Sequence, residues 1–231
     1  MTDHKIVSRT EWIEARRRLL AQEKAFTRQR DELSEARRGL PWVRVDKEYA
    51  FDTPSGKQTL AQLFDGRSQL VVYHFMFGPD GVACKSCSFW ADNIERNVAH
   101  LNARDVSVVV ISRGPLDKLQ AFKERMGWTF KWVSSGGTDF NFDYGVSFRP
   151  DEKAQTYNYA PKASAMTELP GISVFHKDES GAIFHTYSCY ARGLDMLNGA
   201  YHYLDLVPKG RDEDSLPFHS EWLRRHDEYR G

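Results

Sequence analysis

The chain has 231 residues, of which 41% are hydrophobic and 13% aromatic, which is enough for one sizeable core. Its 32 lysines and arginines balance 32 aspartates and glutamates, so net charge does not point to nucleic acid or an anionic membrane. No stretch approaches the ~20 apolar residues that span a bilayer, and the N-terminus lacks the apolar core of a signal peptide. We therefore expect a cytoplasmic protein without nucleic-acid or membrane partners.

The first 40 residues predict a helical extension. Ser8 and Glu11 have the spacing of a capping box, and Gly39 and Pro41 mark the end of the helix. Apolar residues then recur every seven positions, at Trp12, Leu19, Phe26 and Leu33. This narrow stripe faces either the protein's own surface or a second subunit, so a homodimer through this helix is one expected assembly.

The core is expected to span residues 42–207. Residues 43–63 predict a hairpin around a turn at 53–56, and Leu70–Phe77 predicts a strand buried on both faces. A Gly-Pro-Asp-Gly loop follows, and a helix is then predicted from Cys84, with its apolar face at Trp90, Ile94, Val98 and Leu101.

The second half of this core continues with alternating elements. A buried strand is predicted at 106–112, a helix at 116–126, a strand at 128–133, and an antiparallel hairpin after Pro170. Residues 134–169 lack periodicity but are rich in aromatic residues, which predicts an insertion folded over the core, either near the cysteines or as a packing flap. Helical spacing follows at 194–204, and residues 208–231 form a charged tail with a short helical pattern around Trp222.

Cys84 and Cys87 form a C-x-x-C pair at the junction from a buried strand into a helix. Unpaired amides and aligned peptide dipoles at a helix N-terminus stabilise a thiolate, so Cys84 is the expected nucleophile and Cys87 the thiol that closes a disulfide. The pair could instead be half of a zinc site, but no second C-x-x-C or paired-His motif is present, and Cys189 is the only other cysteine. The spacing favours redox chemistry.

The order of elements resembles the thioredoxin fold in its peroxiredoxin-like form. The matching parts are a hairpin with Gly56-Lys57-x-x-Leu60-x-x-Leu63, strand 70–77, the C-x-x-C helix, strand 106–112 and Leu169-Pro170 before a hairpin. The segments HFMFGP, RMGWTFKWVSS, DFNFDYG and LPGISVF are also similar to a bacterial thioredoxin-like family of unknown function. The resemblance implies an α/β fold with a mixed central sheet flanked by helices, plus the long N-terminal helix and an insertion before a cis-proline position.

The resemblance also implies roles for individual residues. Pro170 takes the position of the cis-proline that faces the C-x-x-C. His74 takes the position of a buried acid that moves protons for the inner cysteine, although it could equally be a core histidine. Gly81 replaces the threonine that precedes a peroxidatic cysteine, which argues against peroxide reduction. Lys85 is expected to stabilise a Cys84 thiolate through its charge.

Beside the cysteines, a substrate wall is expected from five residues: Trp128, Trp132, Ser134, Asp139 and Phe140. Cys189 is either a disulfide relay or a buried core residue. His100, His185 and His202 are the candidate metal partners of the pair, and each has a structural or solvated alternative.

The leading hypothesis is a thiol–disulfide oxidoreductase that acts on a disulfide-bearing or small-molecule substrate with a thiol reductant. Alternatives are a non-catalytic binding module with a ligand in an aromatic cleft, and a metal-handling Cys/His protein. No G-x-G-x-x-G or P-loop motif is present, so no nucleotide cofactor is expected.

Overall fold

The computed structural model describes residues 4–152 and 154–229, and the chain divides into two compact units between Pro41 and Trp42. The first unit consists mainly of helix α1, Arg9–Arg38. Ser8 and Glu11 cap it reciprocally, as their spacing predicted, and none of its residues is buried. Within the described ranges, no helix combines the length and the apolar character needed to cross a bilayer.

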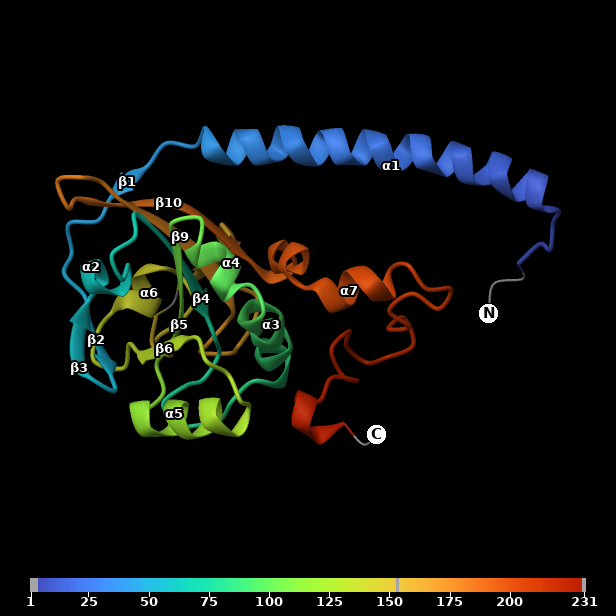
Figure 1. Ribbon diagram of the computed structural model, residues 1–231. Coiled ribbons are helices and arrows are strands. Elements are labelled where there is room, and N and C mark those ends of the chain that lie inside the picture. Colours follow the sequence, from blue (N-terminus) through green and yellow to red (C-terminus); the bar gives the residue numbers. More distant parts are fainter. Residues whose placement is uncertain (1–3, 153, 230–231) are drawn as a thin grey trace. The chain divides into compact units, whose positions relative to one another are not determined.

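The second unit is built on a mixed sheet, which has eight strands in the described part of the chain, ordered β1-β10-β9-β4-β5-β6-β2-β3 (Figure 1). The central strand β4, Gln69–His74, runs parallel to β5, Val106–Ser112, and antiparallel to β9, Gly171–Lys177. The remaining strands are β1 (Val43–Arg44), β2 (Ala50–Thr53), β3 (Gly56–Thr59), β6 (Lys131–Ser134) and β10 (Ile183–Tyr190). Parallel strands joined through helices, followed by the β9–β10 hairpin, form the predicted thioredoxin-like arrangement.

Helices complete the second unit on both faces of the sheet (Figure 1). They are α2 (Leu60–Leu63), α3 (Lys85–Glu95), α4 (Val98–Asn102), α5 (Leu116–Arg125), α6 (Phe140–Asp143) and α7 (Gly199–Leu204), with short 3₁₀ helices η1 (Ala191–Leu197) and η2 (His226–Glu228). A separate short hairpin joins β7 (Thr156–Tyr157) to β8 (Ala160–Pro161).

Two hydrophobic clusters occupy the two faces of the sheet. The first cluster packs α3 and α5 against Tyr73, Phe75, Val110 and Trp132, and it includes Cys87 and Cys189. The second cluster packs α2 and α6 against Leu70, Val72, Val109, Ile111 and Phe175. Because successive side chains of a strand point to opposite faces, β4 contributes to both clusters in alternation.

Several predicted boundaries were wrong for local reasons. The hairpin is confined to residues 50–59, because Thr59 and Gln62 cap one another and start α2 instead of extending the strand. The helix predicted from Cys84 ends at Glu95. The Asn97 side chain donates to the carbonyl of Asn93 at 2.7 Å, and in a continuous helix that carbonyl would accept the backbone N–H of Asn97.

Two further predictions needed correction. The strand predicted at 128–133 begins only at Lys131, because Trp128 and Phe130 stack on one another in the first cluster before the strand starts. Around Trp222 the chain forms turns rather than a helix, and the indole donates a hydrogen bond to Glu213 at 2.6 Å. Tertiary packing of aromatic side chains outweighs local propensity at both places.

Candidate thiol site

The loop between β4 and α3 positions Cys84. The chain turns back after Phe77, which pairs with Ala83 in an isolated bridge, and the Cys84 N–H donates to the carbonyl of Met76 at 3.1 Å. Gly81 allows this reversal because its φ of +78° lies in the left-handed region. Cys84 is therefore the N-cap of α3, with its sulfur over the first turn of the helix.

This placement stabilises a thiolate at Cys84. The N–H of Cys87 donates to the Cys84 sulfur at 3.4 Å. The pKa of Cys84 falls to about 6, chiefly through the hydrogen bond from the Cys87 side chain, with help from the backbone N–H groups of Cys87 and Ser86 and the charge of Arg225, against burial. At neutral pH the Cys84 side chain is mostly ionised.

The environment of Cys87 shifts its pKa in the opposite direction and keeps its thiol protonated. It is buried, and burial raises its pKa, with further contributions from the hydrogen bond and charge of Cys84. Its sulfur accepts a hydrogen bond from the Met76 N–H at 3.4 Å, and the hydroxyl of Tyr73 donates to its carbonyl at 3.3 Å. The pair thus consists of a reachable thiolate and an inner, protonated thiol.

A cavity of about 580 Å³ opens next to the two sulfurs, and we call it the thiol pocket. Its volume lies within the ~300–1,000 Å³ typical of small-molecule sites. Most of its lining is apolar and comes from four segments of the chain. The residues around it are Tyr73, Met76, Cys84, Ser86, Cys87, Trp90, Met166, Leu169, Pro170, Ala191, Arg192, Leu194, Asp195, Tyr201, Arg211, Glu213, Phe218, His219 and Ser220.

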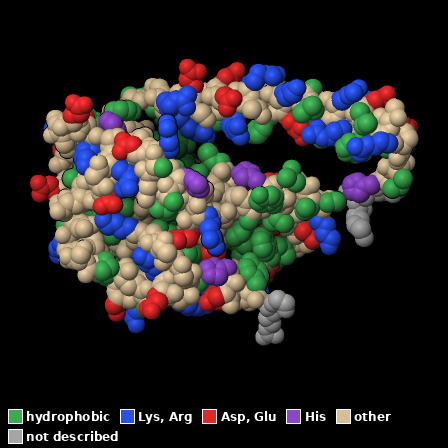
Figure 2. Space-filling view, viewed as in Figure 1, with side chains coloured by type: hydrophobic (Ala, Val, Ile, Leu, Met, Phe, Trp, Pro, Cys, Tyr) green, Lys and Arg blue, Asp and Glu red, His purple; other side chains and the backbone are tan. Residues whose placement is uncertain are grey.

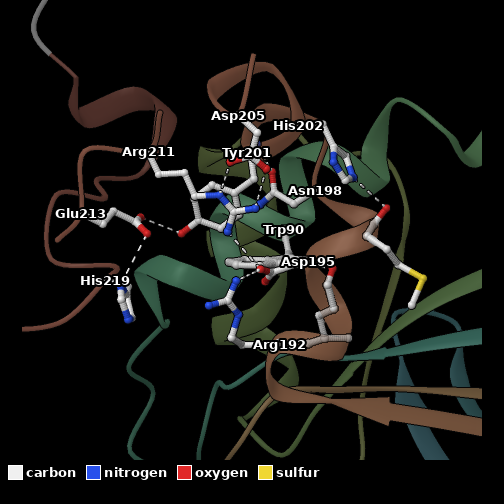
Figure 3. Close-up of polar contacts among 12 residues, drawn as sticks. Trp90, Arg192, Asp195, Asn198, Tyr201, His202, Asp205, Arg211, Glu213 and His219 are labelled. Carbon is white, nitrogen blue, oxygen red and sulfur yellow. Dashed lines mark hydrogen bonds and ion pairs between the residues drawn. The ribbon is translucent and has the colours of Figure 1, made fainter. Parts of the chain in front are cut away.

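Charged side chains on one wall of the thiol pocket are bonded to one another (Figure 3). Arg211 bridges two carboxylates, at 3.0 Å to Asp195 and 2.8 Å to Asp205. Glu213 is 7% exposed and accepts hydrogen bonds from the Tyr201 hydroxyl at 3.1 Å and the Trp222 indole at 2.6 Å. Outside this wall, hydrophobic side chains gather over α7 and the chain that follows it (Figure 2).

Pro170 and His74 have different positions relative to the cysteines. Pro170 lines the thiol pocket, and its carbonyl accepts a hydrogen bond from the Tyr157 hydroxyl at 2.7 Å. Pro170 takes the position of the family's cis-proline, and the peptide bond before it is trans. His74 lies on the opposite face of the sheet, where its ring packs beside Phe140 and its Nε2 bonds Ser173 at 2.9 Å. The histidine is a core residue and does not reach the thiols.

None of the five residues expected to form a substrate wall lines the thiol pocket. The indoles of Trp128 and Trp132 are buried in the first cluster and donate to Asp92 and Ser112. The Ser134 hydroxyl donates to the carbonyl of Gly114 at 2.7 Å. Phe140 is fully buried in the second cluster, and Asp139 forms surface ion pairs. These residues build the core and its surface, so the predicted wall is wrong.

The wall is instead formed by residues 191–220, which sequence reasoning assigned to a helix and a charged tail. The helical spacing of Leu194 and Tyr201 was a usable signal, since both residues line the pocket. Of the described residues of the insertion, Met166 and Leu169 line the pocket. Tyr157, also in the insertion, accepts a hydrogen bond from the Ala191 N–H at 2.9 Å and so supports the pocket from behind Ala191. Lys85 is exposed, and the charge that lowers the pKa of Cys84 comes from Arg225 in the tail.

Among residues 4–152 and 154–229, no three His, Cys, Asp or Glu side chains are grouped so that they could hold a metal ion. Of the candidate partners, His185 bonds the Ser188 hydroxyl at 2.7 Å and His202 the carbonyl of Met196 at 3.3 Å. Cys189 is buried in the first cluster beside Gly193, where an added Cβ would lie 3.3 Å from the Cβ of Cys189.

Comparisons with solved structures return peroxiredoxins and a hypothetical protein. Peroxidoxin BcpB from Mycobacterium tuberculosis is 14% identical, with a TM-score of 0.48 over 69% of this chain and 94% of that chain. A peroxiredoxin Q from Xanthomonas campestris is 13% identical, with a TM-score of 0.45 over 67% and 90%. A hypothetical protein, SMc02350 of Sinorhizobium meliloti 1021, is 12% identical, with a TM-score of 0.41 over 62% and 68%. These values imply nothing about the activity of the present chain.

No curated protein matches the chain. A family model does, and it spans residues 1–229, which includes α1, the thiol pocket and the tail that walls it. The chain therefore belongs to the family described as bacterial protein of unknown function, DUF899.

Proposed function

We propose that the protein is a thiol–disulfide oxidoreductase in which Cys84 attacks the substrate and Cys87 resolves the product. One observation carries the proposal: Cys84, with its pKa lowered to about 6, lines an open cavity next to a buried, protonated Cys87. A thiol that serves only packing has no reason to be ionised at neutral pH beside a cavity.

The reaction has two exchange steps. The Cys84 thiolate attacks one sulfur of a disulfide, forms a mixed disulfide and expels the other sulfur as a thiolate. Cys87 then gives up its proton to solvent or to that leaving thiolate and attacks the Cys84 sulfur, which releases the second substrate thiol. The products are two thiols and a Cys84–Cys87 disulfide, which an external dithiol reduces back to the starting state.

In this scheme the surrounding residues keep the two thiols in different states. The Cys87 N–H and the first turn of α3 hold the Cys84 thiolate before the attack. The Met76 N–H, 3.4 Å from the Cys87 sulfur, is placed to stabilise the second thiolate as it forms. The buried position of Cys87 keeps that sulfur from reacting first.

The test is turnover of a small disulfide with dithiothreitol as reductant, followed by release of the product thiol. We expect Cys84→Ser to reduce turnover to the uncatalysed rate. Cys189→Ser is the matched control, because it removes a thiol from the same hydrophobic cluster without touching the pair, and it should retain activity. Equal turnover by wild type and Cys84→Ser would reject the proposal. If both are inactive and an apolar ligand still raises the melting temperature, the pocket serves binding alone.

A further inference from the structure

Apart from Ser86, the part of the thiol pocket nearest the sulfurs is apolar. Met76, Trp90 and Leu194 belong to the cluster that contains Cys87, and Leu169 and Pro170 line the same cavity. The indole N–H of Trp90 is already engaged, at 2.9 Å to the carbonyl of Leu194, so its ring presents only carbon to the cavity. A substrate group held beside Cys84 thus meets hydrocarbon, sulfur and aromatic surface.

The charged groups around this pocket already have ion-pair or hydrogen-bond partners within the protein. Arg211 is shared between Asp195 and Asp205, and its guanidinium lies 4.0 Å from the centre of the Tyr201 ring (Figure 3). Glu213 is satisfied by a hydroxyl and an indole, with His219 at 3.8 Å. An anionic substrate would have to break these bonds to gain a partner.

One lining cation is different, because the Arg192 side chain is 80% exposed and makes a single ion pair, at 3.2 Å to Asp195. A charge this exposed is screened by water and salt, so it contributes little to holding a carboxylate. The interior of the pocket therefore offers no strong partner for an anionic group, and burying an unpaired charge there is costly.

We propose that the thiol pocket selects small, uncharged disulfides with apolar or aromatic substituents over anionic ones. This inference rests on the proposed function and deepens it. In the selecting step the Cys84 thiolate forms a bond to one substrate sulfur, the substrate S–S bond breaks, and the departing aryl or alkyl thiolate leaves with the electron pair. Apolar contacts with Trp90 and Leu194 hold the substituent in place during this step.

Two aromatic disulfides, one uncharged and one anionic, test the selection. 4,4′-Dithiodipyridine is uncharged at pH 7, whereas 5,5′-dithiobis(2-nitrobenzoate) is a dianion, and both release chromophores. The variant Cys87→Ser with Cys189→Ser leaves Cys84 as the one thiol, so the rate constant of its attack on each reagent is measured directly. The ratio of the two rate constants cancels the fraction of Cys84 present as thiolate. The same ratio for the urea-unfolded variant corrects for intrinsic reactivity.

We expect the corrected ratio to favour the uncharged reagent by about tenfold or more, because the dianion must enter without a buried partner. A corrected ratio near one, or one that favours the dianion, would overturn the selection. If both reagents also react faster with the folded variant than with the unfolded one, the proposed function stands. If Cys84 reacts more slowly with both reagents in the folded variant than in the unfolded variant, both proposals are overturned.

A charge placed in the pocket gives a second readout. Met166 lines the pocket and is 50% exposed, so Met166→Lys should fold and should shift the ratio toward the dianion severalfold. Met196→Lys is the matched control, since Met196 is 44% exposed and lies outside the lining. Equal ratios for the two lysine variants would contradict the proposal.

Discussion

The side chains of neighbouring β4 residues point to opposite faces of the sheet, and the two faces differ in how completely the side chains around these residues fill the space. Tyr73 belongs to the first cluster, lines the thiol pocket and bonds the carbonyl of Cys87. His74, the next residue, is buried beside Phe140 and bonded to Ser173. On the first face a cavity remains next to the Cys84 thiolate, whereas on the second face aromatic side chains fill the space around His74. Chemistry should therefore depend on the first face and stability on the second.

The largest effect is expected from Cys87→Ser. Without the resolving thiol, Cys84 can still attack, so the variant should release one equivalent of thiol per chain and then stop with a mixed disulfide. Stopped-flow release assays and intact-protein mass spectrometry would detect this. Continued turnover at the wild-type rate would show that an outside thiol, and not Cys87, resolves the intermediate.

A pair of Phe→Ala variants contrasts the two faces in stability. Phe140 is fully buried in the second cluster, so Phe140→Ala should lower the free energy of unfolding by about 3–5 kcal/mol and leave the pH dependence of Cys84 reactivity unchanged. Phe218 is an exposed residue of the pocket lining, so Phe218→Ala should change stability by about 0.5 kcal/mol or less. Urea unfolding distinguishes them, and similar losses at both sites would undo the contrast.

His74, on the face of the second cluster, should make the stability of the protein sensitive to acid. Burial lowers its pKa to about 3 from an ordinary value of 6.5. Between these two pH values His74 is protonated in the unfolded chain but neutral in the folded protein. Stability should therefore fall as pH drops from 6.5 toward 3, by at most about 1.4 kcal/mol per pH unit from this group. His74→Gln should remove this slope in urea unfolding measured at several pH values. Parallel curves for wild type and variant would show that the folded protein accepts the proton.

The smallest expected effect belongs to the tail. Arg225 donates to the carbonyl of Ala83 at 2.8 Å, and its charge helps lower the pKa of Cys84, after the larger hydrogen-bond contributions. Arg225→Gln should therefore raise the midpoint of Cys84 alkylation by less than about one pH unit. Arg224→Gln is the control, because the Arg224 guanidinium donates to carbonyls of its own turn and not to the Ala83 carbonyl. Equal midpoints in the two variants would exclude a charge effect of Arg225.

Local sequence signals predicted the frame of this site well. The C-x-x-C pair after a buried strand placed Cys84 at the N-terminus of a helix, where it is the N-cap of α3. The apolar run at 106–112 matches β5 residue for residue. The Ser8 and Glu11 spacing likewise located the start of α1. These features depend on backbone hydrogen bonds and periodicities a few residues long, which a sequence displays directly.

The pocket wall could not be predicted in the same way. Whether Trp132 or Trp90 faces the cavity depends on packing between segments about 100 residues apart, such as the bond from Trp90 to Leu194. His74 could not be placed from the sequence for a similar reason. A shift of one position along a strand moves a side chain from the face of the first cluster to the face of the second. Aromatic composition marked residues 134–169 as ordered but did not say which face they would cover.

The most direct test of this account is the pH dependence of Cys84 alkylation in reduced, metal-free protein, read peptide by peptide by mass spectrometry. The account predicts a midpoint near pH 6, the pKa that Cys87, the first turn of α3 and Arg225 give to Cys84, with Cys87 unlabelled at neutral pH. A Cys84 midpoint near the ~8.5 of a free thiol, or no labelling at all, would contradict it.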